Sequence, residues 1–284
     1  MQKLLIILLA GCCFFSCDSN QPTPAFIHIE EFDFAALPGE GTSSENITEL
    51  WVYQDGVTML GAYDLPADIP VLSEGNTGLR IYPGIKNNGI STTRIIYPFY
   101  TYYETNLNLE SGAEYQVTPS FKYREDLAIS EYDFESGIPM EPYGTNSGQF
   151  ELVSDDRVFE GDKSGFATLE PDQAQLLYRT ENSFEWTAGE TVFLEMNYSC
   201  NNTFAVGLYA INSANETRNF ALILNPTREG TGDPVWKKVY VDLGFVIKEN
   251  SNADHFELYI ESVHDVSGNT VELYFDNLKL VQYD

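Results

Sequence analysis

The chain has 284 residues, and its 43 aspartates and glutamates outnumber 15 lysines and arginines, which gives a formal net charge of −28 at pH 7. Such a surface excludes nucleic acid as a partner, because phosphate binding depends on clustered basic side chains. The length is sufficient for two domains that each bury a core. Three of the four cysteines lie within the first seventeen residues, so Cys200 alone is left and cannot form an internal disulfide.

The first seventeen residues resemble a bacterial lipoprotein signal. A basic residue precedes an apolar run at 4–10, and a small residue stands directly before Cys12 and before Cys17. In such signals the peptidase cuts before a cysteine that is then acylated. The polar tether at 17–23 favours Cys17 as the lipidated residue, with Cys12 as the alternative. The apolar run is too short to span a bilayer, so we expect residues 1–16 to be removed and lipid to hold the protein on the outer membrane, exposed at the cell surface.

The remaining chain is rich in strand signals. Turn pairs separate short runs of aromatic and β-branched residues, and no long stretch has the apolar spacing of a helix. We therefore predict an all-β protein. A small N-terminal β-sandwich is expected at 24–124, a linker or short turn at 125–131, and a second domain at 132–284.

The first domain begins with a hairpin signal. A strand at 50–54, a turn at Asp55-Gly56 and a return strand at 60–63 predict two paired antiparallel strands. The proline-containing and Glu-Gly-Asn turns that follow at 65–84 resemble those of PEGA-type surface β-sandwiches. That resemblance implies a spacer or binding platform.

An aromatic segment at 97–103 has two interpretations. On a strand, Tyr97, Phe99 and Tyr103 would share one face and Tyr100 and Tyr102 the other. One row could be exposed and hold a sugar or a partner protein. In the alternative, one row belongs to a core and the other packs beneath the neighbouring domain or a loop.

In the second domain, apolar residues alternate at 192–199, 238–243 and 255–261, which predicts half-buried antiparallel strands. In the last strand the apolar positions change phase at Asp276-Asn277. That slip predicts a β-bulge there, or a strand that is buried on both faces.

Four further segments occur in the order found in one fold family: YDFESG at 132–137, FEGDKSGFATL at 159–169, WKKVYVDL at 236–243 and LYFDNLKL at 273–280. With them the domain resembles the galactose-binding-like jelly rolls, the fold of many carbohydrate-binding modules.

This resemblance implies a structural calcium ion. Glu135 and Asp276 would be its carboxylate ligands, and Asp162 or the carbonyl groups of Gly161 and Lys163 would complete the six to eight oxygens that calcium requires. In the alternative, Glu135 and Asp276 accept hydrogen bonds from backbone donors at strand ends.

The resemblance also implies glycan binding by aromatic side chains. We expect Trp186, which lies just before a turn and should be exposed in a loop, and Tyr209 to be the ligand-binding residues. Trp236 is expected in the core, because the tryptophan of this strand normally packs into the fold in the resembled family.

No pattern of catalytic residues is found. The three histidines lack the spacing of a metal-binding motif, and neither a nucleophile elbow nor a phosphate-binding glycine loop occurs. We therefore expect a non-catalytic, lipid-anchored surface protein that binds glycan through its second domain. The alternative is an accessory subunit of an outer-membrane transporter, secretion or assembly complex, with both β domains used for protein contacts.

Overall fold

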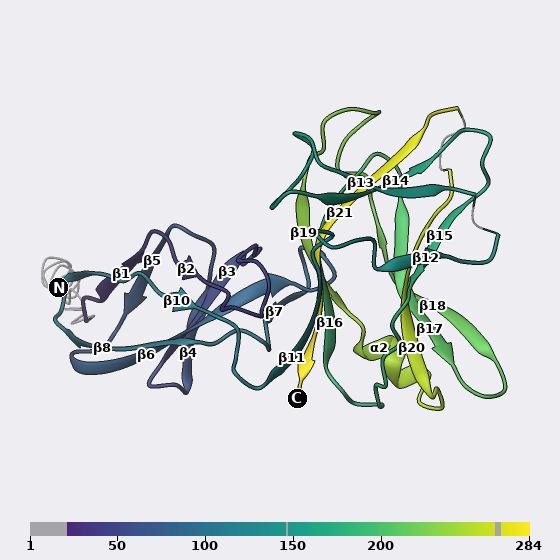
Figure 1. Cartoon of the computed structure of the whole chain (residues 1–284). Helices are drawn as coiled ribbons and strands as arrows, with labels where there is room; N and C mark the ends of the chain where they lie inside the picture. The colour runs from purple at the N-terminus through teal and green to yellow at the C-terminus, as the bar shows by residue number, and fades with distance from the viewer. Residues whose placement is uncertain (1–21, 146, 265–267) are drawn as a thin grey trace, which may run out of the picture.

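The computed structural model describes residues 22–145, 147–264 and 268–284, and it consists of two lobes built almost entirely of β-strands (Figure 1). The predicted all-β class is confirmed. The signal sequence, Cys17 and the start of the tether lie outside the described residues. Within the described part of the chain, no helix is long and apolar enough to cross a membrane.

The first lobe contains three sheets around one core. The main sheet has the order β4-β3-β6-β7, with β8 on the other half of the long strand β6; the smaller sheets are β5-β1-β9 and β10-β2. The strands are β1 (Ala25–Ile29), β2 (Asp33–Phe34), β3 (Glu49–Gln54), β4 (Thr58–Tyr63), β5 (Ala67–Val71), β6 (Gly75–Lys86), β7 (Arg94–Ile96), β8 (Tyr103–Leu109), β9 (Glu114–Gln116) and β10 (Ser120–Phe121).

The hairpin prediction for this lobe is confirmed. Strands β3 and β4 pair antiparallel, and both Asp55 and Gly56 in the connecting turn have positive φ angles, 51° and 69°. Aspartate tolerates this left-handed region better than most residues, and glycine adopts it without a steric penalty.

The second lobe is a sandwich of two antiparallel sheets. We name the sheet β13-β14-β21-β16-β19, to which β11 adds beside β21, the β21 sheet, and the sheet β12-β15-β20-β17-β18 the β20 sheet. The elements are β11 (Leu127–Tyr132), β12 (Met140–Pro142), β13 (Gln149–Val153), β14 (Ser164–Leu169), β15 (Leu176–Thr180), β16 (Val192–Cys200), β17 (Phe204–Ile211), β18 (Glu216–Leu224), β19 (Lys237–Asp242), α2 (Gly244–Glu249), β20 (His255–Ser262) and β21 (Val271–Tyr283).

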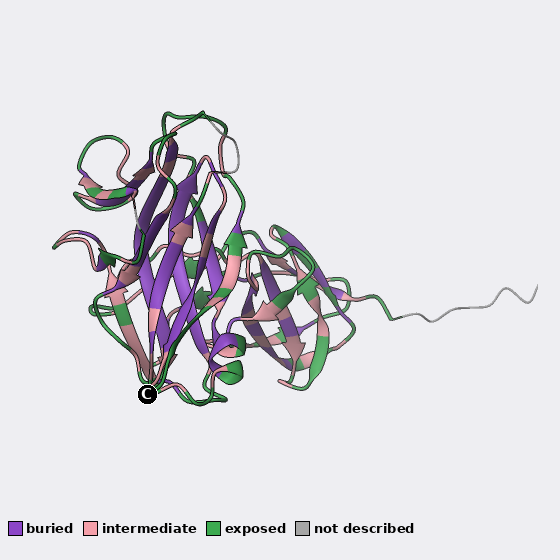
Figure 2. Ribbon diagram, turned by 90° about the vertical axis from the view of Figure 1, so that its right-hand side faces the viewer, coloured by how far each residue is buried: buried purple, intermediate pink, exposed green. Residues whose placement is uncertain are grey.

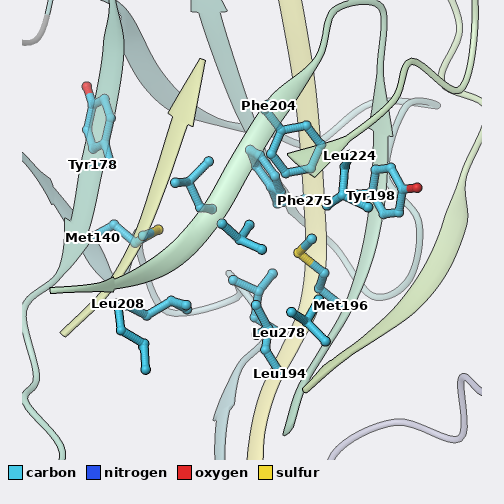
Figure 3. Close-up of a cluster of buried hydrophobic side chains, with 14 of the residues drawn as sticks. Met140, Tyr178, Leu194, Met196, Tyr198, Phe204, Leu208, Leu224, Phe275 and Leu278 are labelled. Atoms are coloured by element: carbon cyan, nitrogen blue, oxygen red, sulfur yellow. The ribbon is translucent and has the colours of Figure 1, made fainter. Parts of the chain in front are cut away.

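Both sheets of the sandwich contribute side chains to one hydrophobic core. Leu194, Met196 and Phe275 from the β21 sheet meet Phe204 and Leu208 from the β20 sheet, and all five are buried (Figure 3). Figure 2 shows this buried interior continuing through the larger lobe. The alternation predicted for 192–199 and 238–243 therefore points the correct residues inward, but β16 is buried along its whole length instead of half-buried.

The predicted linker at 125–131 is wrong. Leu127–Tyr132 forms strand β11, which pairs antiparallel with the end of β21. Leu127 and Ile129 pack against the apolar cluster between the lobes. The polar residues before and within this segment concealed a short alternation of apolar residues that one face of the strand buries.

The predicted β-bulge is confirmed. Between the pairs Glu195–Lys279 and Asn197–Asp276 the register shifts, so that β21 contains one residue more than β16. Asn277 lies at this point with a φ of 50°. The bulge keeps both Asp276 and Asn277 buried while the apolar positions of the strand change face.

The aromatic segment lies between the lobes. Tyr97, Phe99 and Tyr100 come from the turn between β7 and β8, and they pack against Phe193 and Tyr240 of the β21 sheet. This confirms packing beneath the neighbouring domain for these three residues, whereas Tyr102 is 42 % exposed. A turn instead of a strand places Phe99 and Tyr100 in the same apolar cluster.

Candidate functional site

The first lobe covers much of the outer face of the β21 sheet. Glu195 lies at the centre of the contact, where its carboxylate accepts hydrogen bonds from the hydroxyl groups of Tyr97 (2.7 Å) and Tyr123 (2.9 Å). The ammonium group of Lys238 lies 2.7 Å from the same carboxylate. Because this interface is both packed and hydrogen-bonded, the two lobes form one rigid surface there.

Beside this interface, a groove of about 880 Å³ remains open between the lobes. The first lobe lines it with two loops, and the second lobe lines it with the neighbouring edge strands of its two sheets, β18 and β19. The lining residues used below are Glu45, Asn46, Lys86, Asn88 and Ile90 from the first lobe, and Phe159, Tyr198, Ile223, Asn225, Trp236, Lys237 and Lys238 from the second.

Apolar and aromatic groups form one part of the groove. Trp236 lies against Phe159, with 5.2 Å between the ring centroids, and is only partly buried. Ile90 and Ile223, which come from different lobes, are 47 % and 56 % exposed at the groove. An aromatic ring and exposed aliphatic side chains can pack against an apolar ligand surface.

Amide side chains attach the loops of the first lobe to strand β19. The Asn88 side chain accepts a hydrogen bond from the Asp242 N–H group (2.9 Å), and the Asn46 side chain donates one to the Lys238 carbonyl group (3.0 Å). The φ of Asn88 is 55°, a conformation that asparagine adopts more readily than most residues. These bonds hold both lobes in fixed positions around the groove.

Glu45 is the only acidic residue among the described residues that line the groove. Burial raises the pKa of its carboxyl group, although the Ile47 N–H group donates a hydrogen bond to it and Lys238 lies nearby. Burial likewise raises the pKa of Tyr198 to about 12, so its hydroxyl group is neutral at pH 7. This hydroxyl points away from the other labelled core residues (Figure 3).

The expected exposure of Trp186 is wrong. Trp186 is only 5 % exposed, and its ring stacks between Phe184 and Phe256 in the core. Its indole N–H group donates a hydrogen bond to Gln282. Phe184 forms a β-bridge with Phe256, which draws the segment around Trp186 into the sandwich.

Tyr209 is also buried, on the outer face of the β20 sheet. Its ring packs against Tyr143 and Tyr259, and it is 5 % exposed. The structure does not bring it near Trp186: the two side chains belong to different clusters on opposite faces of the β20 sheet.

Trp236 has the position that we expected of Trp186. It lines the groove, although the sequence placed it in the core. In β19 the residues Val239 and Val241 point inward, so Trp236 has the parity of Lys238 and faces outward. That alternation was the available signal. The contribution of the loops at 44–46 and 86–90 has no comparable signal, because it arises from packing of the lobes.

Glu135 and Asp276 lie beside the loop between β13 and β14, which contributes the backbone N–H group of Asp162 but not its exposed carboxylate. Glu135 accepts hydrogen bonds from the N–H groups of Asp162 (2.7 Å) and Lys163 (3.0 Å). Asp276 accepts one from Ser164 (2.6 Å) and one from its neighbour Asn277 (2.8 Å). Backbone donors at strand ends thus account for most of these contacts.

Among the described residues, no group of three or more acidic, histidine or cysteine side chains is arranged to hold a metal ion. The loop presents N–H groups to Glu135, where a calcium ion would need carbonyl oxygens. As placed, the donor set does not fit calcium. Binding would require the loop at 161–163 to turn, and the calcium site stays a prediction.

No family model and no curated protein matches the chain. Solved structures similar to it include a carbohydrate-binding module of the β-sandwich superfamily, described for promiscuous specificity (11% identity, TM-score 0.41, covering 91% of this chain and 97% of that one). TmCBM61 in complex with β-1,4-galactotriose is similar over 54% of this chain and 94% of its own (15% identity, TM-score 0.34). The K1 cleaved adhesin domain of Lys-gingipain from Porphyromonas gingivalis W83 covers 54% of this chain and 97% of its own (13% identity, TM-score 0.38). With identities of 11–15% and TM-scores below 0.5, these similarities give no information about a ligand or a binding site of this chain.

Proposed function

We propose that the protein is a non-catalytic glycan-binding protein of the cell surface, and that the groove between the lobes is its binding site. The observation that carries this proposal is the combination of the partly exposed Trp236 ring with amide groups from both lobes. Sugar rings present C–H faces that pack on aromatic rings, and their hydroxyl groups pair with amides.

A non-catalytic role agrees with the acids of the groove. Hydrolysis of glycosidic bonds generally requires two carboxyl groups on opposite sides of the bond. Among the described lining residues, Glu45 is the only acid. The groove therefore offers surfaces for binding without the pair that hydrolysis would use.

Binding is tested by titrating the mature chain with oligosaccharides in a calorimeter, after a glycan array has identified a ligand. We expect Trp236→Ala to weaken binding about tenfold and Trp236→Phe to restore most of it. Because Trp236 also packs on Phe159, circular dichroism must show that the variant is folded. Asn225→Ala, at an exposed position of the groove, provides a second variant that does not disturb this packing.

The exposed Val57, in the turn of the first hairpin, gives a control, and Val57→Ser is expected to bind like the wild type. Absence of binding to any glycan would refute the proposed function. Equal binding by wild type, Trp236→Ala and Asn225→Ala would refute the groove as its site.

We further propose that lipid on Cys17 holds the protein on the outer membrane. The described chain starts at the end of the first lobe that faces away from the second lobe (Figure 1). An anchor before this point would place the groove at a distance from the bilayer.

The anchor is tested by metabolic labelling with a fatty acid and fractionation of cells. Cys17→Ala should lose the label, whereas continued labelling would move the anchor to Cys12. Protease treatment of intact cells should release the protein if it faces outward.

An accessory subunit of an outer-membrane complex remains the second candidate. Phe220, on the edge strand β18, is 67 % exposed, and exposed apolar side chains on an unpaired sheet edge favour protein contacts. Native purification in mild detergent should then return a stoichiometric partner from wild type and not from Phe220→Asp. Purification of the wild type without such a partner would refute this candidate.

A further inference from the structure

The basic residues of the chain are distributed unevenly between paired and unpaired positions. Within the described residues, all seven arginines form ion pairs with acidic side chains: Arg80, Arg94, Arg124, Arg157, Arg179, Arg218 and Arg228. The described lysines differ from the arginines, because only Lys122 and Lys238 form ion pairs.

Two of the lysines without an ion pair meet at the groove. Lys86 at the end of β6 and Lys237 at the start of β19 both line it, and neither forms an ion pair within the described part of the chain. Lys237 is exposed and Lys86 is partly exposed. Each lobe therefore contributes one ammonium group whose charge is not compensated by a neighbouring carboxylate.

The other charges of the groove do not cancel these two. Lys238 is paired with Glu195, so that pair is neutral as a whole. Glu45 is the only acid among the described lining residues and can offset only one of the two ammonium groups. The groove thus carries a positive local charge on a protein whose net charge is −28.

We propose that the ligand of the groove is an anionic polysaccharide, with carboxylate or sulfate groups on its sugar rings; this rests on the proposed glycan-binding function. Lys86 and Lys237 contact the anionic groups from opposite lobes, while Trp236 packs against a sugar ring. The exposed Asn225 amide is available to its hydroxyl groups, whereas the Asn46 amide already donates to the Lys238 carbonyl group.

The large negative charge of the protein does not prevent this binding. At physiological ionic strength the screening length is about 8 Å, so acids farther from the groove act weakly on a ligand inside it. They do repel polyanions from the remaining surface, which confines binding to the groove.

The proposal is tested with the mature full-length chain and three kinds of probe. Polygalacturonate supplies carboxylates, chondroitin sulfate supplies sulfates together with carboxylates, and pullulan is a neutral control. We expect the wild type to bind at least one of the anionic polymers and to bind pullulan more weakly. Raising the salt concentration should weaken the anionic interaction steeply.

Lys86→Gln and Lys237→Gln are each expected to weaken binding of the anionic polymer about fivefold, which corresponds to loss of one partly exposed ionic contact. Lys248→Gln is the matched control. Lys248 lies on α2, also lacks an ion pair among the described residues, and does not line the groove. This variant should bind like the wild type.

Each other outcome overturns a specific statement. The wild type could instead prefer a neutral glycan, with binding lost in Trp236→Ala and unchanged in both groove lysine variants. This result would refute the anionic ligand but not the glycan-binding function. An equal loss in Lys248→Gln would show general charge attraction and refute the site. Absence of binding to every glycan would refute both proposals.

Discussion

Lys238 and Glu195 form an ion pair of 2.7 Å in which the two side chains are only 2 % and 0 % exposed. The pair lies on the outer face of the β21 sheet beneath the first lobe. Tyr97 and Tyr123 donate hydrogen bonds to the same carboxylate, and the Lys238 ammonium group also donates to the Ser44 carbonyl group (2.6 Å). The charges are thus compensated by groups from both lobes.

Removal of one charge from this pair should destabilise the whole chain. Lys238→Met leaves buried Glu195 without its ion-pair partner, with the cross-strand Lys279 as the remaining nearby cation, and is expected to lower the free energy of unfolding by about 3 kcal/mol. Urea denaturation of the mature chain measures it. Arg80→Gln removes a far more exposed ion pair and should lower the free energy of unfolding much less. If both variants lowered the free energy of unfolding by a similarly small amount, the expected contribution of the buried Lys238–Glu195 pair to stability would be wrong.

Asp276 should make stability depend on pH. Burial raises the pKa of its carboxyl group from 3.8 to about 6, with Glu135 adding a smaller electrostatic contribution. Between these two values the folded state binds a proton that the unfolded state does not, so stability falls as pH rises from about 4 through 6. The change amounts to about 3 kcal/mol.

Asp276→Asn removes this dependence, because an amide does not titrate. Urea denaturation at several pH values measures the free energy of unfolding of both proteins. As pH rises, the wild type should lose stability relative to the variant. A difference that is constant from pH 4 to pH 7 would show that Asp276 titrates with its ordinary pKa in the folded chain.

The calcium prediction is tested by thermal unfolding with EGTA and with added calcium. If Glu135, Asp162 and Asp276 hold the ion, EGTA should lower the melting temperature of the wild type, and calcium should restore it. Asp276→Asn should be insensitive to both. An unchanged wild-type melting temperature would remove the site and leave the observed N–H contacts as the role of these carboxylates.

Trp186 should matter for stability instead of binding. Trp186→Ala removes a large core side chain and is expected to cost about 3–5 kcal/mol, measured by urea denaturation. Trp186→Phe should cost less, because a phenyl ring can still stack between Phe184 and Phe256. Glycan affinity of the folded Trp186→Phe protein should equal that of the wild type; a loss of affinity at unchanged stability would return Trp186 to the binding site.

Periodicity predicted those features of the fold that local sequence determines. The Asp55-Gly56 turn and the bulge at Asp276-Asn277 each follow from one or two residues whose backbone preference or phase is visible in the sequence. Strand β11 was missed because its apolar alternation is short and the strand forms by pairing with β21, about 150 residues later in the chain.

The site was less predictable than the fold. The alternation of apolar residues in β19 predicts that Trp236 faces outward, but the family resemblance led us to place this residue in the core. Trp186 lies outside the regular strands, so no periodicity indicated its burial. The loops that carry Lys86 and Asn88 acquire their position only when the lobes pack together.

The aromatic turn at 97–100 has a consequence for any attempt to divide the protein. Cutting the chain before Leu127 would expose Phe193, Tyr240 and Val281 to water and strip Glu195 of two hydroxyl donors. The isolated C-terminal fragment would be prone to self-association through this bared surface. Although each lobe has its own hydrophobic core, we therefore expect each to lose solubility when it is produced without the other.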